Sequence, residues 1–143
     1  MSYVRVWIHA VFATKYRQPI IHNSIRSDFF DHIKSNGHQK NILIDCVNGY
    51  LDHAHVFFLL NRDMSISKAL QLIKGESSHW INAKKILQNN FMWQDDYWAV
   101  SVSESGVKNV RKYIANQVEH HSKKSLLEEI DELGFERFKD GEE

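Results

Sequence analysis

Apolar and polar residues alternate along the first part of the chain, from Tyr3 to Ala13. The apolar residues of one side are Val4, Val6, Ile8, Ala10 and Phe12. Because successive side chains of a strand point to opposite faces, this alternation predicts a strand with one face in the core. The segment from Tyr97 to Ser103 alternates in the same way and predicts another strand.

Helical spacing of apolar residues appears in three other segments. They are Ser24 to Lys40, Ser65 to Leu87 and Gly106 to His121. Apolar residues recurring every three or four positions predict helices with one apolar side. Between the first two segments, the β-rich stretches Ile42 to Tyr50 and His53 to Asn61 are joined by a short link, which predicts an antiparallel hairpin.

The predicted order of elements is strand, helix, strand, strand, helix, strand, followed by one more helix. This order is typical of an α+β ferredoxin-like sandwich, an antiparallel sheet with helices on one face. The extra C-terminal helix carries Tyr113. No linker or repeat interrupts the chain before residue 125. We therefore expect one domain over residues 1–124 and an acidic C-terminal tail over residues 125–143.

The net charge of zero conceals an asymmetry between the two parts of the chain. Residues 125–143 carry eight acids and two bases, whereas the preceding 124 residues carry 16 bases and 10 acids. The basic body permits phosphate binding. Apolar residues among the acids of the tail indicate a short amphipathic helix, and they are Leu126, Leu127, Ile130, Leu133 and Phe135. This tail helix would dock on a partner subunit or cover the basic surface. The alternative is that the tail serves only as a solubilising end.

The compartment is predicted from what the sequence lacks. No apolar run is long enough to span a bilayer, and the N-terminus does not have the pattern of a secretory signal. The single cysteine, Cys46, excludes an internal disulfide and is interpreted as a small core residue. We therefore expect a cytoplasmic protein with no membrane contact.

Two histidines two residues apart form the first candidate site. His53 and His55 flank Ala54 at the start of a β-rich stretch. In a strand, their rings would leave the same face about 7 Å apart along the backbone. This spacing suits two ligands of one metal ion, although structural or surface histidines would produce the same pattern.

The second candidate site lies on the C-terminal helix. The apolar stripe of this helix is expected to comprise Val107, Val110, Ile114 and Val118. Tyr113, Gln117 and His120 fall to one side of that stripe. Tyr113 and Gln117 are four residues apart, so both can address one bound group. A solvent-exposed tyrosine beside an ordinary glutamine is the alternative.

Together the two sites would meet the needs of phosphodiester cleavage by a tyrosine. A phenol is normally protonated, with a pKa of about 10, and a cation is needed to offset charge on the phosphate. The two histidines and the carbonyl oxygen of Gln117 would supply three ligands. We expect a divalent metal, Mg²⁺ or Mn²⁺, with Zn²⁺ also possible on this chemistry.

At these residues the chain resembles the single-tyrosine HUH transposases of the insertion-sequence 200/605 group, the IS200-like transposases. The matching segments, in chain order, are Val11 to Arg17, Asp52 to His55, Lys74 to Ser78, Trp93-Gln94 with Ala99 to Ser103, Tyr113 to Gln117, and His120-His121. The likeness covers roughly residues 3 to 125. The His-hydrophobic-His motif alone is weak, but the ordered set is specific.

The resemblance implies a DNA transposase that cleaves and rejoins single-stranded DNA and binds the hairpin ends of an insertion sequence. It implies that Tyr113 is the nucleophile, forming a 5′-phosphotyrosine intermediate, and that His53, His55 and Gln117 are the metal ligands. No nucleotide cofactor is needed, and the chain has no phosphate-binding loop motif. The resemblance also implies a homodimer in which the tyrosine helix of one chain completes the histidine site of the other.

Other residues are predicted around this site. His120 and His9 are possible neighbours of the metal or the phosphate. Four basic residues are possible contacts to the DNA backbone, namely Lys15, Arg17, Lys68 and Lys74.

Alternative functions remain open from the sequence. One is a different HUH enzyme, a replication initiator or relaxase, although these usually carry further domains. Another is a domesticated or non-mobile relative that acts on dispersed palindromes. The last is a non-catalytic DNA-binding regulator.

Overall fold

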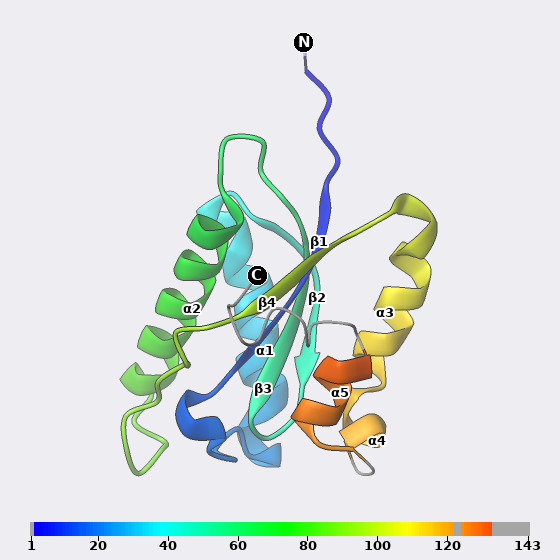
Figure 1. The fold of residues 1–143 in the computed structure, drawn as a ribbon. Helices are drawn as coiled ribbons and strands as arrows, with labels where there is room; N and C mark the ends of the chain where they lie inside the picture. Colours follow the sequence, from blue (N-terminus) through cyan, green and yellow to red (C-terminus); the bar gives the residue numbers. More distant parts are fainter. Residues whose placement is uncertain (1, 122–123, 133–143) are drawn as a thin grey trace.

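The computed structural model describes residues 2–121 and 124–132, and these form a four-stranded antiparallel sheet with helices on both faces (Figure 1). The strands are β1 (Trp7–Ala13), β2 (Leu43–Gly49), β3 (His53–Leu59) and β4 (Trp98–Val102). They lie in the order β2-β3-β1-β4. Helix α1 (Asn23–Gly37) follows β1 and helix α2 (Ile66–Ala83) follows β3, so the order βαββαβ of a ferredoxin-like α+β sandwich is confirmed.

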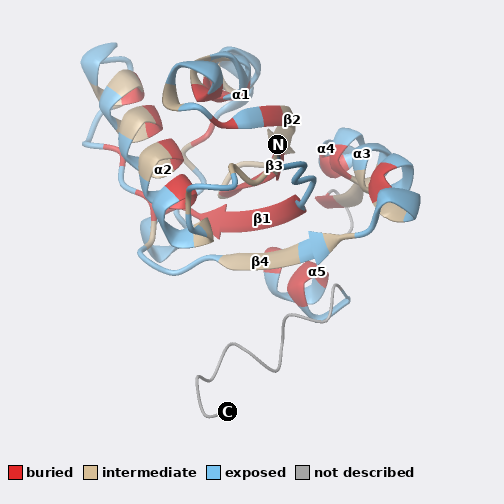
Figure 2. Ribbon diagram, turned by 90° about the horizontal axis from the view of Figure 1, so that it is seen from above, coloured by how far each residue is buried: buried red, intermediate tan, exposed pale blue. Residues whose placement is uncertain are grey.

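In the described residues, three short α-helices follow the last strand and occupy the side of the sheet opposite α1 and α2 (Figure 1). They are α3 (Val107–Ala115), α4 (Gln117–His121) and α5 (Leu126–Glu132). Because both faces are covered, every residue of β1 is buried, as Figure 2 shows. The remaining residues of the predicted acidic tail, including Leu133 and Phe135, lie outside the described residues.

The main core lies between the sheet and the helices α1 and α2. The sheet contributes alternate residues of β1 and β3, and the helices contribute aromatic and aliphatic side chains. The largest of these fully buried side chains include Phe12, Phe29, Phe58, Ile8 and Leu70. Burying one such side chain stabilises the fold by about 1.5–3 kcal/mol. This layer supplies most of the apolar burial, whereas the other face of β1 and β3 combines smaller apolar clusters with buried histidines.

The first strand begins later than the alternation predicts. Tyr3, Val4 and Val6 are 84%, 48% and 38% exposed, and β1 starts only at Trp7. On one side, β4 ends at Val102, which pairs with Trp7, so no strand residue is available beyond it. On the other side, the carbonyl oxygen of Val6 accepts one hydrogen bond from the amide of Leu60, and the residues before Val6 have no ladder partner among the described residues.

The strand β2 fixes the position of α3. The side chain of Asn48 donates hydrogen bonds to the carbonyl oxygens of Ile114 (2.9 Å) and Ala115 (3.3 Å). Asp45 forms a two-point ion pair with Arg111, whose Nη2 lies 2.7 Å from Oδ2. These contacts hold the helix that carries Tyr113 against β2, which is the neighbour of β3 in the sheet.

Two further expectations concern Cys46, which packs against the same apolar cluster as Tyr113, and membrane contact. Cys46 is half-buried, and burial raises the pKa of its thiol to about 12. Within residues 2–121 and 124–132, no helix combines the length and the apolar character needed to span a bilayer. The raised pKa of the Cys46 thiol keeps it in its unreactive, protonated form.

Candidate active site and metal centre

The predicted pair of histidines lies on the face of β3 opposite the main core. His53 and His55 are both fully buried, and their ring centroids are 5.2 Å apart. Their strand pairs with β1, which places His9 on the same face, with its Nε2 atom 2.8 Å from Nδ1 of His55. Burial is the main cause that lowers the pKa of His9 to about 3 and that of His55 to about 4.

The first histidine has a carboxylate behind it. Nδ1 of His53 lies 2.8 Å from Oδ1 of Asp52. Burial opposes a charged ring, but the hydrogen bonds and negative charges of Asp52 and Glu129 outweigh it and raise the pKa of His53 to about 9. The Asp52 contact also orients the ring, because it holds a hydrogen on Nδ1 and turns Nε2 toward the interior of the site.

The helix predicted over Gly106 to His121 is broken at Asn116, so the expectation of one continuous helix was wrong. Asn48 binds the carbonyl oxygen of Ile114, which a continuous helix would pair with the amide of Val118. As a result Val118, predicted to be in the apolar stripe, is 46% exposed. The break separates Tyr113 on α3 from Gln117 at the start of α4.

Tyr113 is half-buried and faces the histidines of its own chain. Its ring centroid lies 5.8 Å from that of His55 and 6.2 Å from that of His9. Its hydroxyl donates a hydrogen bond to Oε2 of Glu129. Burial and this hydrogen bond to a negative group raise the pKa of Tyr113 well above its usual value, so the phenol is protonated in this arrangement.

Gln117 is fully buried beside the same groups. Its Oε1 lies 3.2 Å from Nε2 of His53, and its Nε2 donates to Oε2 of Glu129 at 2.8 Å. The structure therefore brings together all four residues that the resemblance marks as the nucleophile and metal ligands. Their roles stay predictions.

Two residues that were not predicted as ligands lie at the centre of the site, His121 on α4 and Glu129 on α5. Oε1 of Glu129 is 2.6 Å from Nε2 of His121, 3.1 Å from Nε2 of His55 and 3.3 Å from Nε2 of His53. Burial would raise the pKa of Glu129, but the hydrogen bonds with these rings outweigh it and lower the pKa strongly. Glu129 is a buried, ionised carboxylate whose Oε1 atom contacts three histidine rings.

The position of Glu129 follows from how α5 packs. Leu126 and Ile130 lie four residues apart on one side of the helix, and they bury against Val11 and Ala13 of β1. Trp98 and Val100 of β4 complete this contact. The amphipathic pattern of the tail contained this signal, but eight acids in the tail gave no indication of which one would be buried.

The donor set fits a divalent metal ion. His53, His55, His121 and Glu129 each offer one ligand atom, and these atoms lie within 4.8 Å of one another. Imidazoles and a carboxylate are common ligands of Zn²⁺ and of other first-row divalent ions, and the set does not identify one ion. His120 lies at the edge of the group, its Nε2 3.8 Å from Oε2 of Glu129, and has no hydrogen-bond partner for that buried atom within the described residues.

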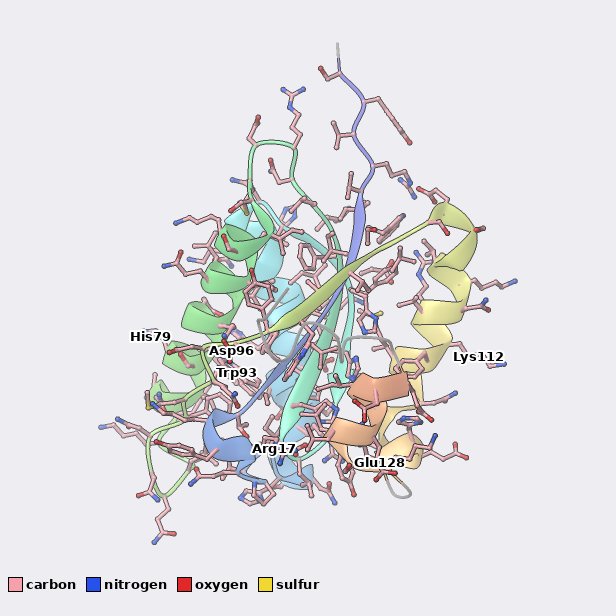
Figure 3. The ribbon with its side chains drawn as sticks, viewed as in Figure 1. Arg17, His79, Trp93, Asp96, Lys112 and Glu128 are labelled. Atoms are coloured by element: carbon pink, nitrogen blue, oxygen red, sulfur yellow. The ribbon has the colours of Figure 1, made fainter. Side chains whose placement is uncertain are left out.

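The predicted DNA contacts are spread over the surface and differ in availability. Lys15, Arg17 and Lys68 are exposed, and Figure 3 labels Arg17 near the end of β1. Lys74 is half-buried, and its ammonium donates to the carbonyl oxygens of Gln94 (2.5 Å) and Asp95 (3.0 Å). Burial lowers its pKa. Of the four, Lys74 has its donors engaged by the protein itself.

Comparison with known proteins identifies the family. The family described as Transposase IS200 like matches residues 2–117. The chain belongs to the IS200-like transposases. Among curated proteins, the ISDra2 transposase TnpA of Deinococcus radiodurans is 21% identical over 114 residues, which are 76% of this chain and 81% of that protein.

Two solved structures share the fold of this IS200-like transposase. One is a transposase structure from Deinococcus radiodurans R1, with a TM-score of 0.65 and 22% identity, covering 82% of this chain and 95% of that chain. The other is a REP-associated tyrosine transposase bound to a REP hairpin, with a TM-score of 0.54 and 19% identity, covering 84% of this chain and 72% of that chain. At these identities the likeness supports the fold.

Proposed function

We propose that this IS200-like transposase cleaves and rejoins single-stranded DNA through a covalent link to Tyr113. The observation that carries the proposal is the convergence of the Tyr113 hydroxyl with His53, His55 and Gln117 in one buried cluster. A nucleophile beside a possible cation site is the minimal arrangement for transfer of a phosphodiester.

The chemistry follows from the positions of these groups. The Tyr113 oxygen attacks the phosphorus and forms a new oxygen–phosphorus bond, so that the strand stays linked to the protein through its 5′ phosphate. The bond between this phosphorus and the 3′ oxygen of the preceding nucleotide breaks. The phenol loses its proton, and the leaving 3′ oxygen gains one to become a hydroxyl. A divalent metal held by His53, His55 and Gln117 would supply charge stabilisation for the phosphate. Attack of a 3′ hydroxyl on the tyrosine link reverses these steps and rejoins a strand, so no nucleotide cofactor is consumed.

The substrate that we propose is single-stranded DNA with hairpins. The family membership supports DNA as the substrate, and the REP hairpin bound by one structural neighbour supports a folded single strand. The second candidate function, a non-mobile relative that acts on palindromes, would use the same folded substrate. The excess of bases over acids in residues 1–124 is consistent with a polyanionic ligand.

We further propose that Tyr113 acts in the site of its own chain. The support is that Tyr113 and His55 lie side by side in a single chain, with ring centroids 5.8 Å apart. The homodimer with a tyrosine supplied in trans, which the resemblance implies, is the competing arrangement. Mixing a Tyr113→Phe chain with a His53→Ala chain separates them, because trans assembly restores part of the cleavage and assembly within one chain restores none.

The experiment that tests the function uses oligonucleotides from the genomic flanks of the gene. Each single strand, with and without its palindrome, is incubated with the protein and Mg²⁺ or Mn²⁺, and covalent adducts are separated on denaturing gels. We expect an adduct that Tyr113→Phe abolishes and that Tyr3→Phe retains, since Tyr3 is 84% exposed and remote from the histidines. Hairpin binding without any adduct would instead favour a non-catalytic regulator.

A further inference from the structure

Three imidazoles of the site point their Nε2 atoms at one carboxylate oxygen. The rings are those of His53, His55 and His121, and the oxygen is Oε1 of Glu129. All four side chains are buried. The family resemblance marks His53 and His55 as ligands but gives no role to His121 or Glu129, so this arrangement needs its own explanation.

The other nitrogen of each ring shows where the hydrogens lie. Nδ1 of His121 is 2.7 Å from the carbonyl oxygen of Lys124, and Nδ1 of His53 is 2.8 Å from a carboxylate oxygen of Asp52. Both oxygens only accept, so each Nδ1 carries a hydrogen, and a neutral ring then presents a lone pair at Nε2. Nδ1 of His55 faces Nε2 of His9, a buried neutral ring that can accept its hydrogen in the same way.

Lone pairs aimed at a carboxylate oxygen require a positive centre between them. In the metal-free chain a proton on Nε2 of His53, which also faces the amide oxygen of Gln117, supplies part of it, but two or three adjacent imidazolium ions in a buried site would repel each other. A divalent cation provides it without that cost. Histidine ligands typically donate their second N–H to a carboxylate or backbone carbonyl, and both kinds of support are present here, at Asp52 and at Lys124.

We propose that His121 and Glu129 complete a four-ligand metal site with His53 and His55. When α5 is docked, this site binds a divalent transition-metal ion such as Zn²⁺. Three nitrogens and one carboxylate oxygen favour Zn²⁺, Co²⁺ or Mn²⁺ over Mg²⁺, which prefers oxygen ligands. The inference rests on the proposed function, because it concerns the same site. It differs in the ligand set, because His121 and Glu129 take the place of Gln117 while α5 is docked.

The ligand set has a consequence for DNA. Four protein ligands close a tetrahedral site, whereas a catalytic metal site keeps a position open for substrate. Glu129 is the ligand that can leave, because it belongs to α5, whereas the histidines belong to β3 and α4. Its second oxygen also accepts the hydrogen of the Tyr113 hydroxyl. If a DNA phosphate replaced this carboxylate, it would occupy the vacated coordination position on the metal. The same exchange would release the Tyr113 hydroxyl from its hydrogen bond to Glu129.

The test measures metal binding, and it uses the full chain freed of metal by a chelator. Co²⁺ is titrated and followed by its visible absorption, which is intense for four-coordinate and weak for six-coordinate ions, and Zn²⁺ affinity is obtained by competition. The wild type should bind one ion per chain with the intense spectrum. We expect His121→Ala and Glu129→Gln each to weaken Zn²⁺ binding at least about tenfold and to reduce the cobalt absorption.

Two control variants match these substitutions. His79→Ala removes an exposed histidine on α2, and Glu132→Gln removes an exposed carboxylate on α5. Figure 3 shows His79 on α2 and Glu128 of α5 on opposite sides of the molecule, so the first control lies far from the site. Both controls should bind Zn²⁺ as the wild type does. Circular dichroism checks folding, and if His121→Ala does not fold, Glu129→Gln decides the question because its side chain keeps the same shape.

The outcomes separate this inference from the proposed function. Unchanged affinity and spectrum in folded His121→Ala and Glu129→Gln would overturn it and leave His53, His55 and Gln117 as the ligands. A wild-type chain that binds no Co²⁺ or Zn²⁺ would also overturn it. In either case the adduct assay with Tyr113→Phe still decides the proposed cleavage. Weakened binding in both variants, with a covalent adduct absent from the wild type, would support the four-ligand site and reject the cleavage.

Discussion

The two faces of β1 and β3 are equally buried but chemically different. One face presents Phe58 and Val56 to α1 and α2, and the other presents His53 and His55 to α3, α4 and α5. Apolar side chains are stabilised by any well-packed neighbour, whereas buried polar groups need specific partners. The apolar face therefore sets the stability of the fold, and the histidine face sets which helices and ligands can cover it.

Removing a large side chain from the apolar face should have the largest effect on stability. Phe58→Ala should lower the free energy of unfolding by about 3–5 kcal/mol, because it deletes a fully buried ring and leaves a cavity. Urea denaturation of the metal-free chain measures the change. The control Leu43→Ala, at a residue 59% exposed, should change it by less than about 0.5 kcal/mol. A similar small change at Phe58 would contradict the division between the faces.

Loosening the cover of the histidine face should affect cleavage more than global stability. Ile130→Ala deletes a buried contact that docks α5 on β1, at a cost of about 2 kcal/mol, which corresponds to about a 30-fold rise in the undocked population. We expect the initial rate of adduct formation at saturating Mn²⁺ to rise by up to this factor. Leu127→Ala, at a residue 42% exposed on the same helix, should leave the rate unchanged. A slower reaction in Ile130→Ala would mean that docked α5 is required for cleavage.

The smallest expected effect is on the pH dependence of the free energy of unfolding. Only the histidine face contributes buried rings whose pKa values are lowered by folding. The folded pKa values of His9 and His55 are lowered to about 3 and about 4, so both rings stay neutral while the unfolded chain takes up protons below about pH 6.5. Their contribution is complete above that pH and is lost as the pH falls toward the folded values. Each adds a slope of about 1.4 kcal/mol per pH unit.

Substitution of one of these histidines tests the slope. In the metal-free chain, His9→Phe should lower the slope of unfolding free energy against pH by about 1.4 kcal/mol per unit between about pH 5.5 and 4.5. His38→Gln, at an exposed histidine, is the matched control. Equal slopes for the wild type and His9→Phe would show that His9 is protonated in the folded chain.

The fold was predictable because its signals are local. The alternation in β1, the hairpin of β2 and β3, and the helical spacing of α1 and α2 each lie within one segment, and their order determines the ferredoxin-like sandwich. The same-face placement of His53 and His55 follows from the strand alone. The break at Asn116 was missed because the group that binds the carbonyl oxygen of Ile114 there is the side chain of Asn48, on a strand distant in sequence.

The centre of the site was not predictable for the same reason. His121 and Glu129 acquire their positions from α4 and α5 packing against the sheet, and neither residue lies in a motif that specifies a ligand. Glu129 is one of eight acids in the tail, and only the burial of Leu126 and Ile130 on either side of it turns it inward. Sequence patterns predict an amphipathic helix, but not the face of the sheet on which it docks.

The central claim is that Tyr113 attacks DNA in the site formed by His53 and His55. The most direct measurement is to trap the covalent adduct with a single-stranded palindromic oligonucleotide and Mn²⁺, digest the protein, and locate the DNA-linked residue by mass spectrometry. We expect a 5′ phosphate on the oxygen of Tyr113, absent in His53→Ala. A link to any other residue, or an adduct on Tyr113 that forms fully without His53, would contradict it.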